Sequence, residues 1–593
     1  MVNHDVPATR ILGPALLTAA LLEAFFLKGS LTASGPGVPN SDDFTRLAEV
    51  RDLMGGQGWF DLMQYRLGSA PGVEMHWSRL VDAPIAALIW LGELVLPGQG
   101  EDFAGYAWPF VTMLAALSAI LFGFRRVLPG APLLPACVIG AFALMGGGVF
   151  SPGSFDHHNI QTGLALWLIA LLLPGPGSVR NHAIAGMIAA VMLAIGIETL
   201  PYVVTAAVFV TISLAADSET AKSARAFGLT LAVAIAALFL ALVSPNHYSS
   251  AVCDGFSLFQ LTAAGCGGLI LAFLAHIFRT PRMARFRSAA IIGAGVLLGI
   301  LVLTVFPHCL ANPLASIDPR IRRFWLDSVI EAQSAAEIAR LDPSMLPGLF
   351  GLPLIALIVS AFSTFKRVWV KAHLLFAAML SAALLVTLWQ MRGALFGLPF
   401  AAMPLALWVA RLSAASEESL SRNPLKVVGA WLVSISMFWG LLGTFGAASL
   451  SDSPTLSEQA SSVSPEERCY DPAQFEPLAN EPDGTILGAT SLGAMVLRHT
   501  GFRTLAGPYH RNSAGNLAWI EAMTGTSDAA RAIMLREKVT ILAICPKGAD
   551  EADFIADSPQ GFLGKLLAGD VFPWLEPVGS ARGGALRFWR VKN

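Results

Sequence analysis

The chain has 593 residues, of which 54% are hydrophobic and only 13% are charged, whereas a soluble domain carries about 25% charged residues. With a mean hydropathy of +0.61, we expect a polytopic membrane protein. The 39 basic and 41 acidic residues leave a net charge of -2, so there is no overall basic field that would attract nucleic acid. Six cysteines without a CxxC pair exclude zinc ribbons and iron-sulfur sites.

Apolar runs long enough to cross a bilayer, which takes about 20 residues, follow one another along most of the chain. The thirteen runs are 11–27, 105–123, 132–150, 160–174, 183–198, 201–216, 227–244, 256–276, 288–306, 345–363, 372–389, 393–410 and 427–447. The first run follows Arg10 and is interpreted as a retained signal anchor. A shorter run, 82–97, carries Glu93 and either spans the membrane or lies in its interface.

The placement of basic residues decides between these two alternatives. If 82–97 does not span and the N-terminus is cytoplasmic, every connection assigned to the cytoplasm is basic. These connections contain Arg125, Arg126, Arg180, Lys222, Arg225, Arg279, Arg282, Arg285, Arg287, Lys366, Arg367, Lys371, Arg411, Arg422 and Lys426. We therefore predict thirteen spans, an interfacial or re-entrant segment at 82–97, and outer loops at about 28–104 and 307–344.

Composition changes sharply after the last apolar run. We predict a transmembrane domain at 1–447 and an outer domain of the α/β class at 448–593, with Ser449 to Pro465 as a linker rich in Ser, Pro and Glu. Cys469 and Cys545 are the only cysteines of the outer domain and would lie in an oxidising compartment. A disulfide between them is favoured, and two unpaired thiols are the alternative.

Two outer segments indicate a metal site, because ionisable residues at the membrane edge are costly and are functional candidates. Ser41-Asp42-Asp43-Phe44 follows the Gly/Pro-rich stretch Ser34 to Pro39. Adjacent carboxylates bind a hard divalent cation or act as a base, although two solvated turn aspartates are the commoner outcome. In Asp156-His157-His158 the mixture of oxygen and imidazole ligands suits Mn²⁺ or Mg²⁺.

Three further outer segments are candidates with structural alternatives. Glu331 lies beside basic residues in the 307–344 loop, where an amphipathic surface helix is the favoured alternative. Arg392 either snorkels to the headgroups or neutralises a diphosphate with its guanidinium fork. His76-Trp77-Ser78-Arg79 precedes the 82–97 segment, and Trp77 is also typical of an aromatic belt.

The predicted topology gathers these scattered groups on one side of the membrane. Asp42, Asp156, His158, Glu331 and Arg392 all fall at the outer surface when thirteen spans are drawn. Three acids, an imidazole and an arginine at one lipid-water boundary suit a metal-dependent transferase that acts on a lipid-linked phosphate or diphosphate.

In their order along the chain, these motifs resemble the catalytic subunit of oligosaccharyltransferases. This family includes single-chain bacterial and archaeal enzymes and their eukaryotic counterpart, with a GT-C fold of thirteen spans and a C-terminal exoplasmic domain. Ser41-Asp42-Asp43-Phe44 with Val50 to Gly56 looks like its first acidic motif and the following helix. Phe155-Asp156-His157-His158 looks like the archaeal form of its second motif.

Two more segments carry the resemblance. Ser328-Val329-Ile330-Glu331 is similar to the TIXE-type motif of the family's mobile fifth outer loop, and Arg392, seven residues before Pro399, resembles the arginine near the start of the twelfth span. The resemblance implies that Asp42, Asp156 and His158 bind the metal. It also implies that Asp42 activates the acceptor.

One departure from the family concerns the acceptor. The WWD motif that recognises the Ser or Thr of a glycosylation sequon should lie where this chain has Leu487 to Gly493, which contains neither tryptophan nor aspartate. This absence argues against ordinary sequon-directed N-glycosylation. The polar cluster Pro508-Tyr509-His510-Arg511-Asn512 serves another acceptor or donor, or is a structural turn.

The function predicted from the sequence is a metal-dependent, inverting GT-C glycosyltransferase. It would move a sugar or glycan from a polyprenyl-linked carrier to an outer protein, glycan or lipid acceptor, with Mg²⁺ or Mn²⁺ as cofactor. Catalysis is assigned to Asp42, Glu331 and Arg392, and weaker substrate contacts to Asp43, His157, His76, Trp77, Tyr509, His510 and Arg511.

Other assignments stay open. Within enzymes, the alternative is a GT-C transferase with a lipid monophosphate sugar donor that modifies proteins, lipids or polysaccharides. From another class, the alternatives are a transporter or a non-catalytic membrane scaffold, although Glu198 is one of few charges at membrane depth and no repeat is visible. We expect a bacterial inner membrane, surrounding membrane lipids, a cytoplasmic N-terminus and a periplasmic C-terminal domain.

Overall fold

The computed structural model describes residues 9–32, 40–175, 177–279, 284–310, 317–418, 424–448, 467–579 and 584–592. The linker Ser449 to Pro465 and the stretch Ser34 to Pro39 lie outside the described residues. The chain divides into two compact units. We call Met1–Lys28, Trp77–Pro313 and Glu331–Ser453 the helical unit, and Gly29–His76, Leu314–Ile330 and Pro454–Asn593 the mixed unit. The mixed unit thus joins the C-terminal segment to stretches of both predicted outer loops.

Long apolar helices make up the helical unit, as the hydropathy pattern predicts. They are α1 (Thr9–Thr32), α3 (Arg79–Val95), α4 (Gly100–Val127), α5 (Leu134–Met145), α6 (His158–Leu172), α7 (Ser178–Ile195), α8 (Leu200–Ala216), α9 (Ala221–Leu242), α10 (Leu258–Ile277), α11 (Ala284–Val305), α14 (Met345–Phe365), α15 (Val370–Trp389), α16 (Ala394–Phe400), α17 (Ala402–Glu418), α18 (Pro424–Val433) and α19 (Ser436–Ala448). A short α13 (Ala335–Leu341) precedes α14.

Each of the thirteen predicted apolar runs contains a helix, but the helices differ in length and some runs are helical only in part. Among the described residues, ten helical segments are long and apolar enough to cross a membrane. The pair α18 and α19, bent by 79°, would add an eleventh, whereas α5 and α6 are shorter apolar helices. Most of the 82–97 segment belongs to α3, which ends at Val95, has 17 residues and is not among the spanning candidates.

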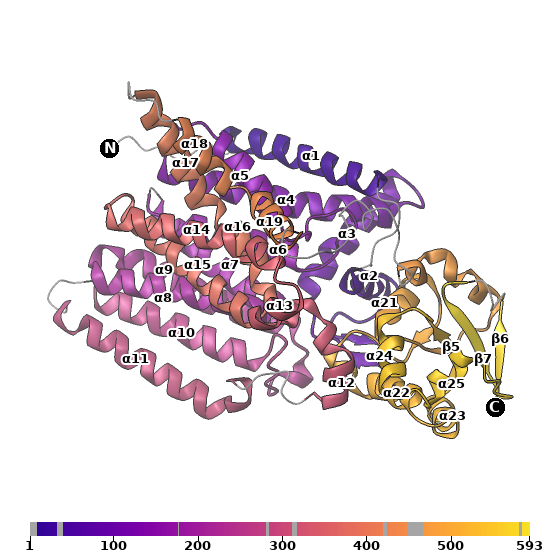
Figure 1. The fold of residues 1–593 in the computed structure, drawn as a ribbon. Helices are drawn as coiled ribbons and strands as arrows, with labels where there is room; N and C mark the ends of the chain where they lie inside the picture. Colours follow the sequence, from indigo (N-terminus) through magenta and orange to yellow (C-terminus); the bar gives the residue numbers. More distant parts are fainter. Residues whose placement is uncertain are drawn as a thin grey trace. The chain divides into compact units, whose positions relative to one another are not determined.

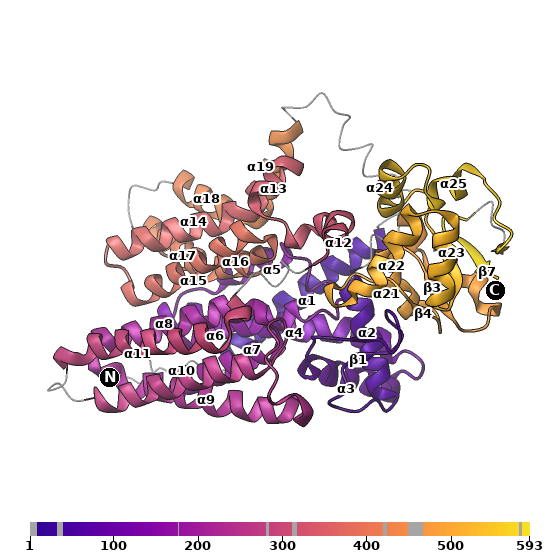
Figure 2. The ribbon, with the colours of Figure 1, turned by 90° about the horizontal axis from the view of Figure 1, so that it is seen from below.

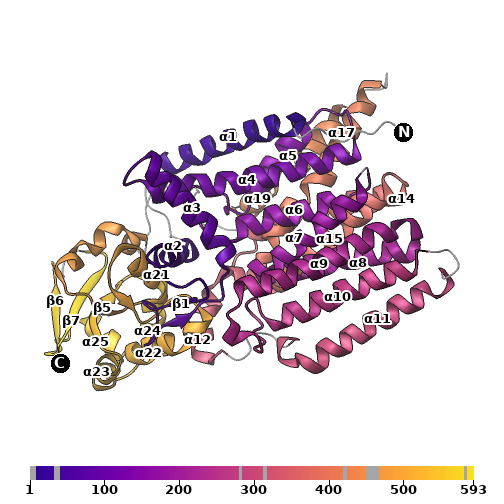
Figure 3. The same cartoon turned by 180° about the vertical axis from the view of Figure 1, so that it is seen from behind.

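Small residues allow the central helices to approach closely, as in other membrane bundles. A β-carbon added to Gly186 of α7 would collide with the carbonyl oxygen of Phe227 on α9. In the same way, Gly228 of α9 and Gly268 of α10 each face the other's carbonyl oxygen. Helices α9, α10 and α11 consequently lie side by side (Figures 1 and 3).

Three breaks between helices present polar residues that later form the candidate site. Between α5 and α6, Gly153 has φ +86°, a left-handed conformation that favours glycine. Between α7 and α8, extended Gly196 is followed by the 3₁₀ turn Ile197–Thr199. Between α15 and α16 lies the 3₁₀ turn Met391–Gly393.

The mixed unit has a five-stranded sheet in the order β4-β3-β5-β7-β6. The strands are β3 (Thr485–Leu487), β4 (Arg503–Thr504), β5 (Val539–Ile544), β6 (Leu575–Val578) and β7 (Arg587–Val591), and the helices are α12 (Pro319–Phe324), α21 (Thr490–His499), α22 (Ser513–Thr524), α23 (Ser527–Arg536), α24 (Ala549–Asp557) and α25 (Phe562–Ala568). Strand β3 is parallel to β4 and β5, and β7 is antiparallel to β5 and β6. In Figure 2, β3 and β4 lie beside α21.

An N-terminal stretch completes the mixed unit. It comprises α2 (Ser41–Met54), which packs on α21, and the hairpin of β1 (Met63–Gln64) and β2 (Val73–Glu74). The Arg66 guanidinium after β1 donates to the carbonyl oxygens of Leu497 (3.1 Å) and Thr500 (2.6 Å) at the end of α21. A cation at this position satisfies carbonyl groups that have no partner within the helix.

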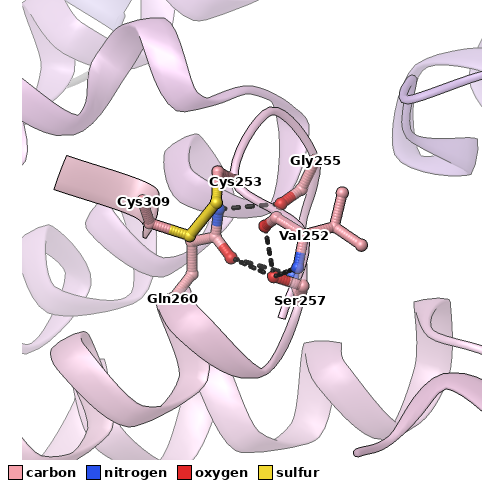
Figure 4. The surroundings of a disulfide bond; sticks show 6 residues. All are labelled: Val252, Cys253, Gly255, Ser257, Gln260 and Cys309. Carbon is pink, nitrogen blue, oxygen red and sulfur yellow. Dashed lines mark hydrogen bonds between the residues drawn. A yellow bond between two sulfur atoms is a disulfide. The ribbon is translucent and has the colours of Figure 1, made fainter. Parts of the chain in front are cut away.

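Two disulfides are present, and one of them was not predicted. Cys469 and Cys545 are bonded, which confirms the favoured pairing in the C-terminal segment. The second bond joins Cys253, in the connection between α9 and α10, to Cys309 after α11 (Figure 4). Ser257 and Gln260 form a capping box at the start of α10 beside this bond. The Cys253–Cys309 bond links two connections of the helical unit covalently, and the Cys469–Cys545 bond links two segments of the mixed unit.

Candidate functional site

Asp156, His157 and His158 form a buried cluster where α6 begins. Each of the three residues is at most 5% exposed. The preceding turn is tied to α4, because the backbone N–H of Gly153 donates to the carbonyl oxygen of Gly105 (2.8 Å). His157 is the N-cap residue of α6 and His158 is its first residue. The start of α6 therefore places all three polar side chains in one buried region of the helical unit.

The Asp156 carboxylate lies between the two imidazoles. Its Oδ1 atom is 2.7 Å from His157 Nδ1 and also accepts from the His157 backbone N–H (2.6 Å). Its Oδ2 atom is 3.8 Å from His158 Nε2. One ligand atom from each of the three residues lies within 4.8 Å of the others. The structure thus brings together two of the three residues that the sequence assigned to a metal.

The donor set of this cluster fits a divalent metal. A carboxylate and a neutral imidazole are common ligands of such ions, with bonds of about 2.0–2.2 Å. The 3.8 Å between Asp156 Oδ2 and His158 Nε2 is within reach of two such bonds. Among the described residues a second group, Cys253, His308 and Cys309, meets the same distance test, but its two sulfurs are joined in the disulfide.

Glu198 lies beside this cluster and was assigned to no site from the sequence. It occupies the 3₁₀ turn before α8, and its Oε1 atom is 3.9 Å from both His157 Nε2 and Arg392 Nη1. Its Oε2 atom accepts a hydrogen bond from Gln161 Nε2 (3.3 Å). The opposite end of the Gln161 amide is 3.0 Å from His158 Nδ1. Glu198 therefore connects the histidine cluster to Arg392.

Sequence reasoning missed Glu198 and Gln161 for an identifiable reason. Glu198 was noted only as a rare charge at membrane depth, and its neighbours come from other helices. Gln161 carried a local signal, because it is three residues after His158 on α6 and therefore on the same helix face. A glutamine that is 0% exposed in an apolar helix requires a polar partner.

Arg392 is at the turn between α15 and α16, and its side chain is 30% exposed. The preceding residue, Met391, donates its backbone N–H to the carbonyl oxygen of Gln333 (2.9 Å). That bond holds the segment that contains Glu331, two residues earlier, next to the Arg392 turn. Glu331 itself is exposed. The predicted surface helix is replaced at this position by a 3₁₀ turn, Ile330–Ala332, ahead of α13.

In the mixed unit, Asp42 is close to the start of α2 and contacts the C-terminal segment. Asn40 caps the helix by accepting from the Asp42 backbone N–H (3.1 Å). The hydroxyl of Tyr509 donates to Asp42 Oδ1 (3.1 Å). Tyr509 is buried, and this burial, reinforced by the Asp42 charge, raises the pKa of the phenol well above its ordinary value. The phenol therefore remains a donor, and it fixes one carboxylate oxygen of Asp42.

The polar cluster around Tyr509 also contacts the β1–β2 hairpin region. The rings of His510 and His76 lie 5.3 Å apart, centre to centre. Arg511 donates from Nη1 to the carbonyl oxygen of Glu74 (3.0 Å). Within the mixed unit, the segment 509–511 is thus brought together with Asp42, Glu74 and His76, and Asp43 follows Asp42 in the first turn of α2. The convergence of Asp42 with Asp156 and His158 stays a prediction.

In the remaining segment, His76-Trp77-Ser78-Arg79, the two residues after Trp77 have structural roles at the start of α3. Ser78 caps α3, and Arg79 forms a buried ion pair with Asp82 (3.1 Å). Trp77 is only 4% exposed, and its ring centre is 6.3 Å from that of His157. The tryptophan thus lies beside the histidine cluster in the helical unit.

Comparison with known proteins finds likeness in structure alone. No family model matches the chain, and no curated protein matches its sequence. The oligosaccharyltransferase of Archaeoglobus fulgidus, tethered to an acceptor peptide with an NVT sequon, aligns at a TM-score of 0.66 and 13% identity, covering 100% of this chain and 74% of that one. In complex with an inhibitory peptide and a dolichol-phosphate, AglB of the same organism gives 0.65 at 12% identity, covering 96% and 72%. The Archaeoglobus fulgidus oligosaccharyltransferase in complex with Zn and sulfate aligns at a TM-score of 0.62 and 13% identity, covering 98% of this chain and 73% of that one.

These alignments confirm the fold that the motifs predicted. The chain has the GT-C fold of oligosaccharyltransferase catalytic subunits, with a helical membrane part followed by a small sheet domain near the C-terminus. Because the identity is 12–13%, the likeness establishes the fold, and the activity has to be argued from the residues of this chain.

Proposed function

We propose that the protein is a metal-dependent, inverting glycosyltransferase. It takes a sugar or glycan from a polyprenyl phosphate or diphosphate carrier and transfers it to an acceptor at the outer membrane surface. The observation that carries this proposal is the buried pair of Asp156 and His158, which Gln161 and Glu198 connect to the partly exposed Arg392. Buried charges in an apolar bundle are costly and mark substrate or ion sites.

The metal ligands in this proposal are Asp156 and His158, joined by Asp42 of the mixed unit. A bound Mg²⁺ or Mn²⁺ supplies positive charge that stabilises the departing phosphate oxygens. Arg392 adds a fixed guanidinium, whose planar fork matches phosphate oxygens. Asp42 orients or deprotonates the acceptor, held by its bond from Tyr509. Direct attack on the anomeric carbon then inverts its configuration.

The acceptor is proposed to be something other than a standard sequon. The stretch after β3 contains Thr490 and Ser491, and their polar atoms have partners within the mixed unit: Thr490 donates to Asp550 Oδ2 (3.0 Å), and the Tyr470 hydroxyl contacts Ser491 Oγ (2.8 Å). Glu331 would seat the acceptor beside the Arg392 turn. Additional substrate contacts are proposed for Asp43, His157, His76, Trp77, Tyr509, His510 and Arg511.

The proposed setting follows from the fold and the charge pattern. A GT-C fold with many apolar helices belongs in a membrane, and the basic connections favour a bacterial inner membrane with a cytoplasmic N-terminus. The C-terminal domain would then be periplasmic. The two disulfides support an oxidising side for the segments that hold them.

Lipid analysis tests the proposed reaction. Membranes of a strain that lacks the gene should accumulate a polyprenyl-linked sugar, which mass spectrometry identifies. Purified full-length protein with Mn²⁺ should then release the polyprenyl phosphate or diphosphate from that lipid fraction, as the sugar passes to an acceptor in an added extract of the same strain or to water. The mass of the released lipid distinguishes a monophosphate donor from a diphosphate donor.

Variants connect that reaction to the site. Asp156→Asn should lower the release rate about 100-fold or more. Asp217→Asn is the matched control, because Asp217 lies at the opposite end of α8, where it pairs with Lys371 (3.6 Å) and accepts from the Glu219 backbone N–H (3.0 Å), a bond that asparagine can also accept. A wild-type protein that leaves the lipid-linked sugar uncleaved, or an Asp156→Asn protein of full activity, would contradict the proposal.

A further inference from the structure

Two hydrogen bonds in the helical unit join Glu198, whose side chain is 13% exposed, to buried Gln161 and Gln161 to buried His158, and we call these three side chains the relay. Glu198 accepts from Gln161 Nε2 (3.3 Å), and Gln161 Oε1 is 3.0 Å from His158 Nδ1. Gln161 is 0% exposed and His158 only 4%. Their two hydrogen bonds therefore form away from water, where a polar group without a partner is costly.

The ionised Glu198 carboxylate determines which groups of the relay donate hydrogen bonds and which accept them. An ionised carboxylate only accepts hydrogen bonds, so it selects the NH₂ end of the Gln161 amide. The carbonyl end of that amide must then face His158, and an amide oxygen only accepts. The proton of neutral His158 is therefore on Nδ1. The lone pair is left on Nε2, the atom 3.8 Å from Asp156 Oδ2.

The contact between Glu198 and Gln161 depends on a glycine in the backbone nearby. Gly196 immediately precedes the turn that carries Glu198. A β-carbon at Gly196 would overlap Glu198 Oε2 and lie 2.5 Å from Gln161 Nε2, so a side chain here would displace the two groups that meet. The absence of a side chain at this position thus leaves the space in which carboxylate and amide bond.

The charge of Glu198 is held by its surroundings. Arg392 Nη1 and His157 Nε2 each lie 3.9 Å from its Oε1 atom. Its other oxygen, Oε2, accepts from Gln161. Each carboxylate oxygen thus faces a donor, which favours the ionised form required by the relay.

We propose that Glu198 is a positioning residue that fixes the tautomer and ring orientation of His158 through Gln161. The inference rests on the proposed metal role of His158 and deepens it. Ligating histidines generally donate their second N–H to a fixed acceptor, and loss of such a partner costs about 10- to 100-fold in metal affinity. Here the acceptor is the amide of Gln161, whose oxygen and nitrogen could exchange places by rotation. The Glu198 carboxylate accepts from the amide nitrogen and so fixes the amide in one orientation.

Metal binding by the purified full-length protein tests the proposal without the transfer reaction. Electron paramagnetic resonance of free Mn²⁺ gives the dissociation constant directly. Glu198→Gln keeps the size of the side chain but can present either end of an amide to Gln161. We expect this variant to bind Mn²⁺ about 10- to 100-fold more weakly. Asp217→Asn, at the other end of α8, should bind as wild type.

Exchanging the Gln161 amide and the Glu198 carboxylate distinguishes a role of Glu198 in positioning His158 from a role in packing alone. In the double variant Gln161→Glu with Glu198→Gln, a carboxylate accepts from His158 and the new amide donates to that carboxylate, so the tautomer is specified again. We expect Mn²⁺ affinity to return to within about fivefold of wild type, whereas Gln161→Glu alone sets two carboxylates 3.3 Å apart and should bind poorly. A role in packing alone predicts no such rescue.

The outcomes distinguish this inference from the proposed function. Wild-type affinity in Glu198→Gln, or a double variant no better than Glu198→Gln, overturns the relay while leaving the metal site in place. Absence of Mn²⁺ binding by the wild-type protein overturns the metal role itself, and the relay with it. If Glu198→Gln fails to fold, Gln161→Met breaks the relay without touching the Glu198 and Arg392 pair, and unchanged Mn²⁺ affinity there is equally contradictory.

Discussion

The hydroxyl of Tyr509 donates a 3.1 Å hydrogen bond to the carboxylate of Asp42, although 467 positions separate them in the chain. Asp42 belongs to the first turn of α2 and Tyr509 to the turn before α22. The acid proposed to activate the acceptor is thus oriented from the C-terminal segment. This contact gives that segment a part in placing the reactive group.

Tyr509→Phe should lower the transfer rate without unfolding the protein, because the ring keeps its packing and only the donor is lost. A hydrogen bond to a charged group contributes about 1.5–3 kcal/mol, so we expect a loss of about tenfold or more in kcat. Tyr65→Phe is the control, since exposed Tyr65 makes a similar bond to Asp61 (3.0 Å). Equal rates in the two variants would remove the role of Tyr509.

Arg392→Lys should show whether the guanidinium acts as more than a charge. Lysine keeps the cation but loses the planar fork that binds two phosphate oxygens at once. We expect a lower kcat, by about tenfold, in the polyprenyl-release assay, and a larger loss in Arg392→Ala. If lysine restores the full rate, Arg392 serves only as a point charge beside Glu198.

Gly196→Ala should weaken Mn²⁺ binding, because its β-carbon would occupy the space where Gln161 meets Glu198. The expected loss in affinity is about tenfold, as for other changes behind a metal ligand. Gly299→Ala on α11 is the matched control, since nothing lies within 4 Å of a β-carbon there. Unchanged Mn²⁺ affinity in Gly196→Ala would contradict the prediction, because it would show that displacing Gln161 and Glu198 does not affect the metal site.

Alkylation of the denatured protein should detect two free thiols before reduction and six after it. The two are Cys137 and Cys266, and the other four cysteines form the disulfides. A mass-tagged maleimide makes each count visible on a gel. Four free thiols in the oxidised protein would show that one of the two bonds does not form. Cys253→Ser should add one free thiol by releasing Cys309.

Local patterns were sufficient for the helices and for several site residues. Apolar runs marked the helices, because a chain in lipid must satisfy its backbone polar groups within each segment. Asp156 and His158 were found together because they are two positions apart. The Cys469–Cys545 bond could be favoured because the C-terminal segment holds no other cysteine.

Contacts between distant segments were beyond the sequence. Nothing near Cys253 marks Cys309 as its partner, since the pairing depends on the ends of α9 and α11 meeting. The role of Glu198 becomes apparent only in the fold, where the break between α7 and α8 faces α6 and the Arg392 turn. A polar side chain acquires its role from its partners, and those partners were 37 and 194 positions away.

The sequence by itself determined that this is a membrane protein, and it predicted basic connections on one side and a few scattered acids, histidines and an arginine on the other. Hydropathy and charge are summed over neighbouring residues, so they can be read in order along the chain. Only the tertiary structure decided which of those polar groups meet: Tyr509 on Asp42, and Glu198 through Gln161 on His158. Hydrogen bonds require atoms within about 3 Å, a condition that helix packing sets and local pattern does not.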